Sequence, residues 1–383
     1  MRTPVVTTCL TLLLVGFASG QDSLNVGFIG GSAPSPTVHA VGVAVSGDYA
    51  YLACWVDQPD TVQGLHVVSI ADPTHPVEVG YCATPGPAQC VSLAGDYACV
   101  ADDDSGLSVI SIADPVHPVE VGHLDLPGRA MAVTVMGDYA YVADDDSGGL
   151  RVISVADPAN PVEVGYCASP TGAGGVAVSG SYAYVTGDSF TVISVADPAH
   201  PSEVGSCGTA SGGVAVSGYY AYVGGTNVVR VADPAHPVEV GHGGQGGTGV
   251  VVAGNLAYVS AWTSGLRVFS LADPGSPGEV GHYQLPGRFV YAYGVTVVGD
   301  YAYVAYDRHG LQIFQYKVAG VEESPKPQAS SHKLAATAIR SLPVGAVAFD
   351  AMGRRVVNPR SGIYFVREAQ AQAQAIRKVI ITK

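Results

Sequence analysis

Short alternating runs of apolar residues recur along most of the chain and predict β-strands. The fullest copies of this pattern lie at residues 95–122 and 137–165. Each begins with a Gly-led turn and a Tyr-Ala-Tyr-Val type run, followed by a second turn, an apolar run and a Pro-Val-Glu-Val-Gly run. A further apolar run precedes the Gly-led turn. Because alternation with a period of two is typical of strands, each copy predicts four short antiparallel strands.

A Gly-x-Tyr-Ala-Tyr-Val type element marks each repeat and occurs seven times, starting at Gly47, Gly95, Gly137, Gly180, Gly218, Gly254 and Gly299. An Ala-Asp-Pro element occurs six times, at Ala71, Ala113, Ala156, Ala196, Ala232 and Ala272. It ends the third strand, since Pro has no backbone donor and pushes the preceding residue into an extended conformation. A spacing of roughly 40 residues with strand composition is typical of propellers. We therefore predict an all-β, seven-bladed propeller of four-stranded blades over residues 21–317.

The seventh repeat is incomplete. It runs from Gly299 to Phe314 without Ala-Asp-Pro and without a fourth strand. Residues Leu24–Gly30 resemble the fourth strand of the first repeat, around Val79–Cys82. We predict that this N-terminal strand closes the ring beside Leu311–Gln315, which would also cover an exposed sheet edge.

The run VADDDSGLSVISIADPVHPVEVGHLDLPG, residues 100–128, resembles the LVIVD repeat of secreted and surface propellers in bacteria and archaea. The resemblance extends over the whole predicted propeller and implies its fold. It departs in the fourth and fifth repeats, where residues 180–205 and 218–241 have clipped second turns.

Residues 1–20 predict a secretory signal peptide. Arg2 provides the positive charge, Val5–Phe17 the apolar core, and Ala18–Gly20 a small-residue cleavage site before Gln21. We expect a secreted protein, either extracellular or on the outer cell surface, with no membrane span after removal of the signal.

The composition changes after the predicted propeller. Residues 318–333 form a polar linker containing Pro and Ser. Residues 334–383 contain Asp350–Val356, Ser361–Arg367 and Arg377–Ile381, and this order resembles the C-terminal sorting domain of type IX (Por) secretion cargo. The resemblance implies a small C-terminal β-sandwich-like domain that engages the type IX secretion machinery.

The charge of the chain narrows the class of partner. Residues 21–316 hold six Arg, no Lys and 28 acidic residues, although the whole chain has a net charge of only −14. An acidic body argues against nucleic acid and anionic membranes as partners. We expect a monomer that binds a protein or a glycan.

Candidate ligand-binding residues fall in the second turns of the blades and in the connections between blades. Both lie on one face of a propeller, and this face varies from repeat to repeat. The sequence predicts nine ligand-binding candidates on this face: His39, Trp55, Arg129, Trp262, Arg288, Tyr291, Asp307, Arg308 and His309. Arg129 and Arg288 lie in matching Leu-Pro-Gly-Arg segments and would either clamp an anion near the axis or offset nearby acidic residues.

Two acidic triplets on the same face raise the question of a metal. Asp102, Asp103 and Asp104 form one, and Asp144, Asp145 and Asp146 form the other. Carboxylate oxygens suit Ca²⁺, but Asp-Asp-Asp-Ser-Gly lacks the spacing of an EF-hand loop and also suits an ordinary turn. No cofactor is expected, with Ca²⁺ as the alternative.

Six cysteines remain after removal of the signal. Cys82, Cys167 and Cys207 occupy one position of the repeat and predict small buried side chains, because equivalent positions in different blades lie too far apart to bridge. Cys54, Cys90 and Cys99 lie in neighbouring repeats, and the sequence leaves open whether two of them form a disulfide.

No catalytic motif is found, so the sequence favours a non-catalytic protein. The alternative is an extracellular hydrolase or lyase, with a cation-assisted site at the propeller axis. That site would bring together Asp103, Asp145, Arg288, Asp307 and His309.

Overall fold

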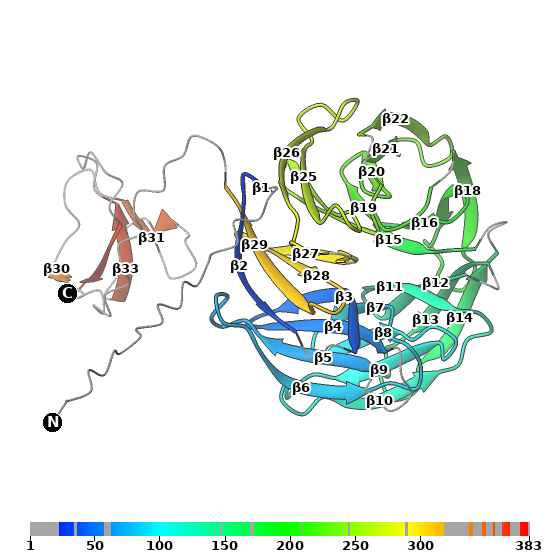
Figure 1. Ribbon diagram of the computed structural model, residues 1–383, viewed down its shortest axis with the longest axis horizontal. Helices are drawn as coiled ribbons and strands as arrows, with labels where there is room; N and C mark the ends of the chain where they lie inside the picture. Colours follow the sequence, from blue (N-terminus) through cyan, green and yellow to red (C-terminus); the bar gives the residue numbers. More distant parts are fainter. Residues whose placement is uncertain are drawn as a thin grey trace, which may run out of the picture. The chain divides into compact units, whose positions relative to one another are not determined.

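The computed structural model describes residues 23–33, 37–56, 63–145, 148–168, 172–208, 210–243, 246–287 and 290–317, and five strands between 337 and 381. The chain divides into two compact units, residues 1–319 and 320–383. In the larger unit, seven antiparallel sheets are arranged like blades around a common axis (Figure 1). The structure therefore confirms the predicted seven-bladed, all-β propeller.

The first three blades each consist of four consecutive strands. Blade 1 contains β3 (Val38–Ser46), β4 (Tyr49–Val56), β5 (Gly64–Ser69) and β6 (Val77–Ala83); blade 2 contains β7 (Cys90–Ala94), β8 (Tyr97–Ala101), β9 (Leu107–Ser111) and β10 (Val119–Leu124); blade 3 contains β11 (Ala130–Met136), β12 (Tyr139–Asp144), β13 (Gly149–Ser154) and β14 (Val162–Cys167).

The next three blades repeat this order. Blade 4 contains β15 (Gly175–Ser179), β16 (Tyr182–Thr186), β17 (Phe190–Ser194) and β18 (Ser202–Cys207); blade 5 contains β19 (Val214–Ser217), β20 (Tyr220–Val223), β21 (Asn227–Arg230) and β22 (Val238–His242); blade 6 contains β23 (Gly249–Ala253), β24 (Leu256–Ser260), β25 (Leu266–Ser270) and β26 (Gly278–Tyr283).

Blade 7 combines the two ends of the propeller sequence. Its inner strands are β27 (Gly294–Val298), β28 (Tyr301–Ala305) and β29 (Leu311–Tyr316), and its outer strand is β2 (Val26–Ser32). β2 pairs antiparallel with β29, with Val26 opposite Tyr316 and Ser32 opposite Leu311. This is the predicted closure of the ring by the N-terminal strand, and the two strands lie side by side in Figure 1.

The N-terminal segment also reaches blade 6, which the sequence did not predict. β1 (Ser23–Leu24) pairs with β26 as a fifth strand of that blade. Asn25 then turns the chain toward blade 7 with a φ of 54°, and its side-chain amide donates to the Val280 carbonyl at 2.8 Å. One continuous segment thus holds blades 6 and 7 together.

The core lies between neighbouring blades rather than inside any one of them. Leu52 and Val68 of blade 1, for example, are fully buried in one cluster with Tyr303 and Ile313 of blade 7. Burying an aliphatic side chain contributes roughly 1.5–3 kcal/mol. A single four-stranded sheet has two faces to cover, so the blades stabilise one another in a ring.

The Gly-led turns behave alike in all seven blades. Gly47, as an example, has a φ of 57° in the turn between β3 and β4. Such a left-handed conformation is costly for a residue with a Cβ, which explains why Gly occurs at this position of every repeat.

The cysteines of the propeller, Cys54, Cys82, Cys90, Cys99, Cys167 and Cys207, are all free. The disulfide that the sequence left open is therefore absent from the described residues. Within the same residues, no helix has the length and apolar character needed to cross a membrane.

The described strands of the second unit form one five-stranded sheet in the order β30-β34-β33-β31-β32. Their bounds are β30 (Thr337–Ile339), β31 (Val347–Phe349), β32 (Arg355–Val356), β33 (Gly362–Arg367) and β34 (Ile376–Ile381). β30 runs parallel to β34, while the other pairs are antiparallel. A sandwich and a sorting role for this unit stay predictions.

Candidate ligand-binding face

Three junctions between blades share one backbone arrangement. Asp103 pairs with Ala130, Trp262 with Ala292, and Asp307 with Ala40, each as an isolated antiparallel bridge. Each bridge has two backbone hydrogen bonds of 3.0–3.2 Å. The second turn of one blade is thereby fastened to the first strand of the next, or to the connection leading into it.

The three turn residues of these bridges are left-handed. Asp103, Trp262 and Asp307 have φ angles of 51°, 50° and 44°. A residue other than Gly rarely adopts this conformation, and it tends to occur where the surroundings hold it firmly in place. These side chains are therefore presented from fixed backbone positions.

At the junction of blades 2 and 3, Arg129 pairs with Asp103. Its Nε donates to Asp103 Oδ1 at 2.6 Å, and its Nη2 donates to Asp103 Oδ2 at 2.9 Å. The guanidinium also lies 3.8 Å from Asp104 and 3.7 Å from Asp145. Arg129 thus offsets three carboxylates, which was one of the two roles considered for it.

At the junction of blades 7 and 1, His39 pairs with Asp307. The Nδ1 of His39 forms a short hydrogen bond with Asp307 Oδ1, and both side chains are buried. The imidazole stacks on the Trp55 indole, with ring centroids 4.1 Å apart and ring planes 9° apart. These three candidates therefore form one packed cluster.

At the junction of blades 6 and 7, the equivalent pair is aromatic. Trp262 meets Tyr291 edge-on at 6.1 Å, and Tyr293 lies 5.6 Å from the same indole. Unlike Asp103 and Asp307, Trp262 is 49% exposed. It is the candidate residue that combines a fixed backbone with a large accessible apolar surface.

Asp144 of the second triplet is fully buried in blade 3. It accepts a short hydrogen bond from Arg151 Nε, and Arg151 Nη1 lies 3.0 Å from Glu163. The guanidinium also lies 4.6 Å from the centre of the Tyr166 ring. A buried carboxylate is expected to need such a partner, so this network fits a structural role for Asp144.

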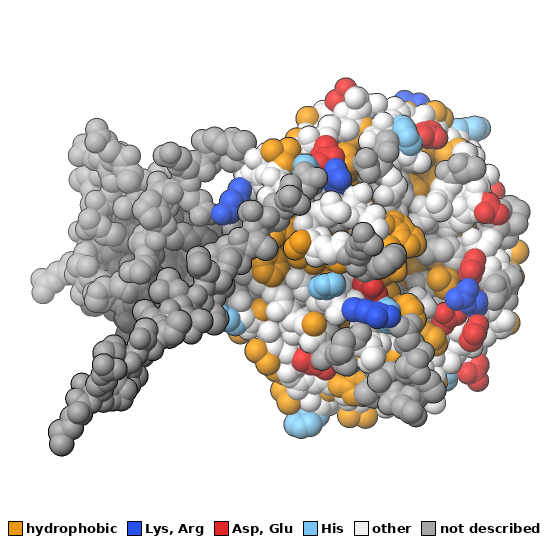
Figure 2. All heavy atoms as spheres, viewed as in Figure 1, with side chains coloured by type: hydrophobic (Ala, Val, Ile, Leu, Met, Phe, Trp, Pro, Cys, Tyr) orange, Lys and Arg blue, Asp and Glu red, His pale blue; other side chains and the backbone are white. Residues whose placement is uncertain are grey.

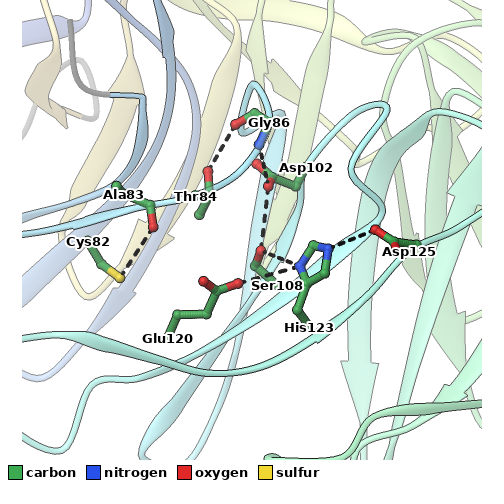
Figure 3. Close-up of polar contacts among 9 residues, drawn as sticks. All are labelled: Cys82, Ala83, Thr84, Gly86, Asp102, Ser108, Glu120, His123 and Asp125. Atoms are coloured by element: carbon green, nitrogen blue, oxygen red, sulfur yellow. Dashed lines mark hydrogen bonds and ion pairs between the residues drawn. The ribbon is translucent and has the colours of Figure 1, made fainter.

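In blade 2, Ser108 stands where Arg151 stands in blade 3, and the network changes (Figure 3). Asp102 is fully buried and accepts a hydrogen bond of 2.8 Å from the Gly86 backbone. Among the described residues no arginine pairs with Asp102, and burial raises the pKa of its carboxyl group.

His123 bridges the same network to the outer edge of blade 2 (Figure 3). Its Nδ1 lies 3.2 Å from Ser108 Oγ, and its Nε2 lies 3.2 Å from Asp125 Oδ1. Although serine, histidine and aspartate meet here, Ser108 is fully buried, so its hydroxyl is closed to a substrate.

The remaining candidates do not gather at one place. Arg308 and His309 are exposed on the second turn of blade 7, and Asp104 is exposed on that of blade 2. Arg288 and Asp146 lie outside the described residues. Within the described ranges, no group of three or more His, Cys, Asp or Glu side chains is arranged to hold a metal ion.

Two cavities among the described residues of the propeller bear on the candidate site. The smaller, of about 230 Å³, runs along the first strands around the axis and is lined mostly by Gly, Ala and Val. Asp103, Asp145, Asp307 and His309, four members of the alternative catalytic set, line neither cavity. They divide between two junctions, with Asp103 and Asp145 near Arg129 and Asp307 near His39.

The larger cavity, of about 760 Å³, lies over blades 4, 5 and 6, and we call it the blade 4–6 pocket. Its walls come from the second turns of these blades and from the connections between them. The lining residues are Gly187, Asp188, Ala210, Ser211, Gly224, Asn227, His242, Gly246, Gly247 and Trp262.

The shortened turns of blades 4 and 5 account for the position of the pocket. At Gly224, φ is 53°, and a Cβ would lie 2.5 Å from the Ser211 carbonyl oxygen. Only Gly permits this approach of the two loops. On the outer side of the pocket, His242 Nδ1 forms a hydrogen bond of 2.5 Å with Asn227 Oδ1.

The sequence predicts Trp262 as a site residue but does not point to Ser211, Asn227 or His242. The signal that the sequence contains for them is the clipped second turn of the fourth and fifth repeats. In the sequence this turn is only a departure from the repeat, whereas in the structure it opens space above these two blades.

Figure 2 shows one face, where acidic and histidine side chains are scattered over the propeller and few Lys or Arg side chains appear. This agrees with the acidic composition of residues 21–316.

The geometry defines a seven-bladed propeller built from sequence repeats, with a pocket on its variable face. The LVIVD repeat model matches residues 39–84, 85–125, 127–169, 171–209, 210–242, 246–284 and 291–314. The chain therefore belongs to the LVIVD repeat family. A comparison with curated proteins finds no match.

Solved structures share the fold at low sequence identity. A computationally designed protein, Ika8, is 10% identical with a TM-score of 0.52, covering 76% of this chain and 100% of its own. BamB from Moraxella catarrhalis is 11% identical with a TM-score of 0.53, covering 76% of this chain and 98% of its own. At such identities the likeness concerns the fold alone.

Proposed function

We propose that this chain is a non-catalytic, secreted or surface-attached binding protein, which holds a glycan or a segment of a protein in the blade 4–6 pocket. The observation that carries this proposal is the half-exposed Trp262 in the wall of a 760 Å³ pocket. Ligand pockets commonly have volumes of about 300–1,000 Å³ and combine apolar surface with a few polar groups.

The distribution of the other polar groups supports binding rather than catalysis. The acidic and basic side chains at the junctions of blades 2 and 3 and of blades 7 and 1 are paired with each other. By contrast, the blade 4–6 pocket offers polar groups from four separate loops and strands beside one exposed indole.

A substitution that fills the pocket tests this function. Gly246 lines the pocket, and a Cβ at this position would have no atom within 4 Å, so the side chain of Gly246→Tyr starts in open space. Gly278 of β26 has the same free surroundings but does not line the pocket, which makes Gly278→Tyr the matched control.

The experiment screens the purified chain against glycan and peptide arrays and then measures the affinity of the strongest ligand by calorimetry. We expect Gly246→Tyr to weaken binding at least tenfold and Gly278→Tyr to leave it within twofold. Equal affinity of wild type and Gly246→Tyr for every ligand found would contradict the proposal.

We also propose that residues 334–383 direct export through type IX secretion, after the predicted signal peptide has directed the chain across the inner membrane. The motifs at 350–356, 361–367 and 377–381 support this proposal. In a bacterium that has this system, deletion of residues 318–383 should leave the propeller in the periplasm. Appearance of the truncated chain in the medium or on the cell surface would overturn the sorting role.

A further inference from the structure

We infer, on the basis of the binding function proposed above, that the ligand of the blade 4–6 pocket is an uncharged saccharide with one sugar ring stacked on Trp262. The inference concerns the chemical class of the ligand. It rests on the presentation of Trp262, on the polar groups that share its pocket and on the charge of the lining.

Trp262 provides a rigid flat surface. Its backbone N–H donates to the Ala292 carbonyl at 3.2 Å, and its own carbonyl accepts from the Ala292 N–H at 3.0 Å. Tyr291 and Tyr293 pack against the indole, yet about half of the residue stays exposed. A rigid aromatic side chain loses little conformational entropy when a ligand covers it, and the apolar C–H face of a pyranose ring matches its flat surface.

The other groups of the pocket suit hydroxyls. A hydrogen bond of 2.5 Å joins His242 Nδ1 to Asn227 Oδ1, and the other nitrogens of the two side chains, Nε2 and Nδ2, are further polar atoms in the wall of the pocket. Asp188 and Ser211 add a carboxylate and a hydroxyl, and both residues are exposed. A sugar hydroxyl both donates and accepts, so it can satisfy each of these groups. A wholly apolar ligand would cover these groups and leave them without hydrogen-bond partners, which is unfavourable.

The charge of the lining selects against anions. The lining residues include Asp188 but no Lys or Arg. A uronic acid or a sulfated sugar would bring its negative charge toward the Asp188 carboxylate without a cation to offset it. The same pocket accepts a neutral sugar with no such electrostatic cost.

The test uses a glycan array that carries neutral, amino-bearing and acidic oligosaccharides, followed by calorimetry with the best ligand of each class. Trp262→Ala removes the stacking surface. Tyr219→Ala is the matched control, because Tyr219 is 70% exposed in the turn between β19 and β20 of blade 5 and does not line the pocket. Thermal melting of each variant verifies folding.

We expect a neutral oligosaccharide to be the ligand that wild type binds best. Its affinity for Trp262→Ala should be at least tenfold lower than for wild type, and its affinity for Tyr219→Ala should lie within twofold of wild type. Because the stack involves Trp262, binding should also change tryptophan fluorescence in wild type and in Tyr219→Ala. Asn227→Ala should weaken the same ligand several-fold, since it removes both the amide and the partner that orients His242.

Failure of this inference is distinguishable from failure of the binding function. If acidic saccharides bind more strongly than neutral ones, or if only peptides bind, the inferred ligand class is wrong. If Gly246→Tyr weakens that binding, the pocket is still the binding site. Binding of a neutral saccharide that Trp262→Ala does not weaken also overturns the inference. Affinities that Gly246→Tyr leaves unchanged overturn the binding function itself.

Discussion

Arg129 and Asp103 are joined by two parallel hydrogen bonds, of 2.6 and 2.9 Å, across the junction of blades 2 and 3. Next to this ion pair, the backbones of Asp103 and Ala130 exchange two further hydrogen bonds. The residues that most resembled a binding site in the sequence therefore connect adjacent blades. The same arrangement occurs with His39 and Asp307 at the junction of blades 7 and 1.

Arg129→Ala should lower the free energy of unfolding by about 1–2 kcal/mol, because Asp103 loses two charge-assisted hydrogen bonds. The Arg129 side chain is 37% exposed, so solvent screens part of the interaction. Urea denaturation followed by circular dichroism measures this difference. An Arg230→Ala variant, altered at an exposed residue at the end of β21, should differ from wild type by less than about 0.5 kcal/mol.

Arg151→Ala should cost more than Arg129→Ala, about 3–5 kcal/mol, because it leaves the fully buried Asp144 carboxylate without its arginine. The same denaturation experiment compares the two variants. Adding Asp144→Asn to Arg151→Ala should recover part of the loss, since the buried charge is then also removed. A double variant less stable than Arg151→Ala would show that charge burial is not the cause.

Asp102 should make the propeller less stable as the pH rises. Burial raises the pKa of Asp102 in the folded chain above the value of about 3.9 that an unfolded Asp has. Its contribution is therefore present below pH 4 and is lost as the pH rises through the folded pKa. The melting temperature of wild type minus that of Asp102→Asn should be most favourable to wild type near pH 4, and this difference should shift in favour of Asp102→Asn by pH 7.

Asp72, Asp114, Asp197 and Asp233 act in the opposite direction, because hydrogen bonds lower their pKa values. They are common to wild type and Asp102→Asn, so they cancel in the difference between the two. If the difference in melting temperature between wild type and Asp102→Asn stays constant from pH 4 to pH 7, Asp102 has the same pKa in the folded and the unfolded chain, which would contradict this prediction.

Deletion of residues 21–31 should lower the melting temperature by about 10 °C or more, at about 2–4 °C per kcal/mol for a domain of this order of size. The deletion removes β1 and nearly all of β2, and with them the partner of β29. Deletion of residues 21–24 removes only β1 and should have a much smaller effect. An unchanged melting curve for the longer deletion would refute closure of the ring by this strand.

Residues 21–383 should contain six free thiols when they are unfolded in the absence of reductant, because all six cysteines of the propeller are free. In the folded chain, Cys54 and Cys99 should not react with a thiol reagent at pH 8. Both are fully buried, and burial raises the pKa of the Cys99 thiol to about 12. A colorimetric thiol reagent counts the accessible thiols of the folded chain without denaturant and all thiols of the unfolded chain with denaturant. Fewer than six thiols in denaturant would indicate a disulfide.

Most of the fold could be predicted, because each repeat carries the same local signals in the same phase. The Gly-led turns, the Tyr-Ala-Tyr-Val strands and the Ala-Asp-Pro ends depend on short-range chemistry that can be inferred from neighbouring residues. The missing fourth strand of the last repeat pointed to β2 for the same reason. β1 could not be foreseen, since Ser23 and Leu24 are too few to form a pattern.

The site was harder to predict, because a sequence gives the type of each side chain but not the side chain with which it pairs in space. Asp103, Arg129 and Asp307 have the chemistry of a ligand site, and the structure pairs them across junctions that no single repeat reveals. Conversely, the blade 4–6 pocket exists because the second turns of blades 4 and 5 are shorter than those of the other blades. Its width is the distance between loops of different blades, which is set only when the ring is closed. The acidic triplets likewise contain residues, such as Asp144, whose partners come from a neighbouring strand.

The pairing of β2 with β29 also has a consequence for the order of events during biogenesis. Val26 is among the first residues of the propeller to be made, and its partner Tyr316 is among the last. The strands of blades 1 to 5 come from sequential stretches of chain, but the ring closes only when the two ends of the propeller sequence meet. Such a distant contact is slow to form, so the blades first make an open arc whose final closure is an intramolecular docking step.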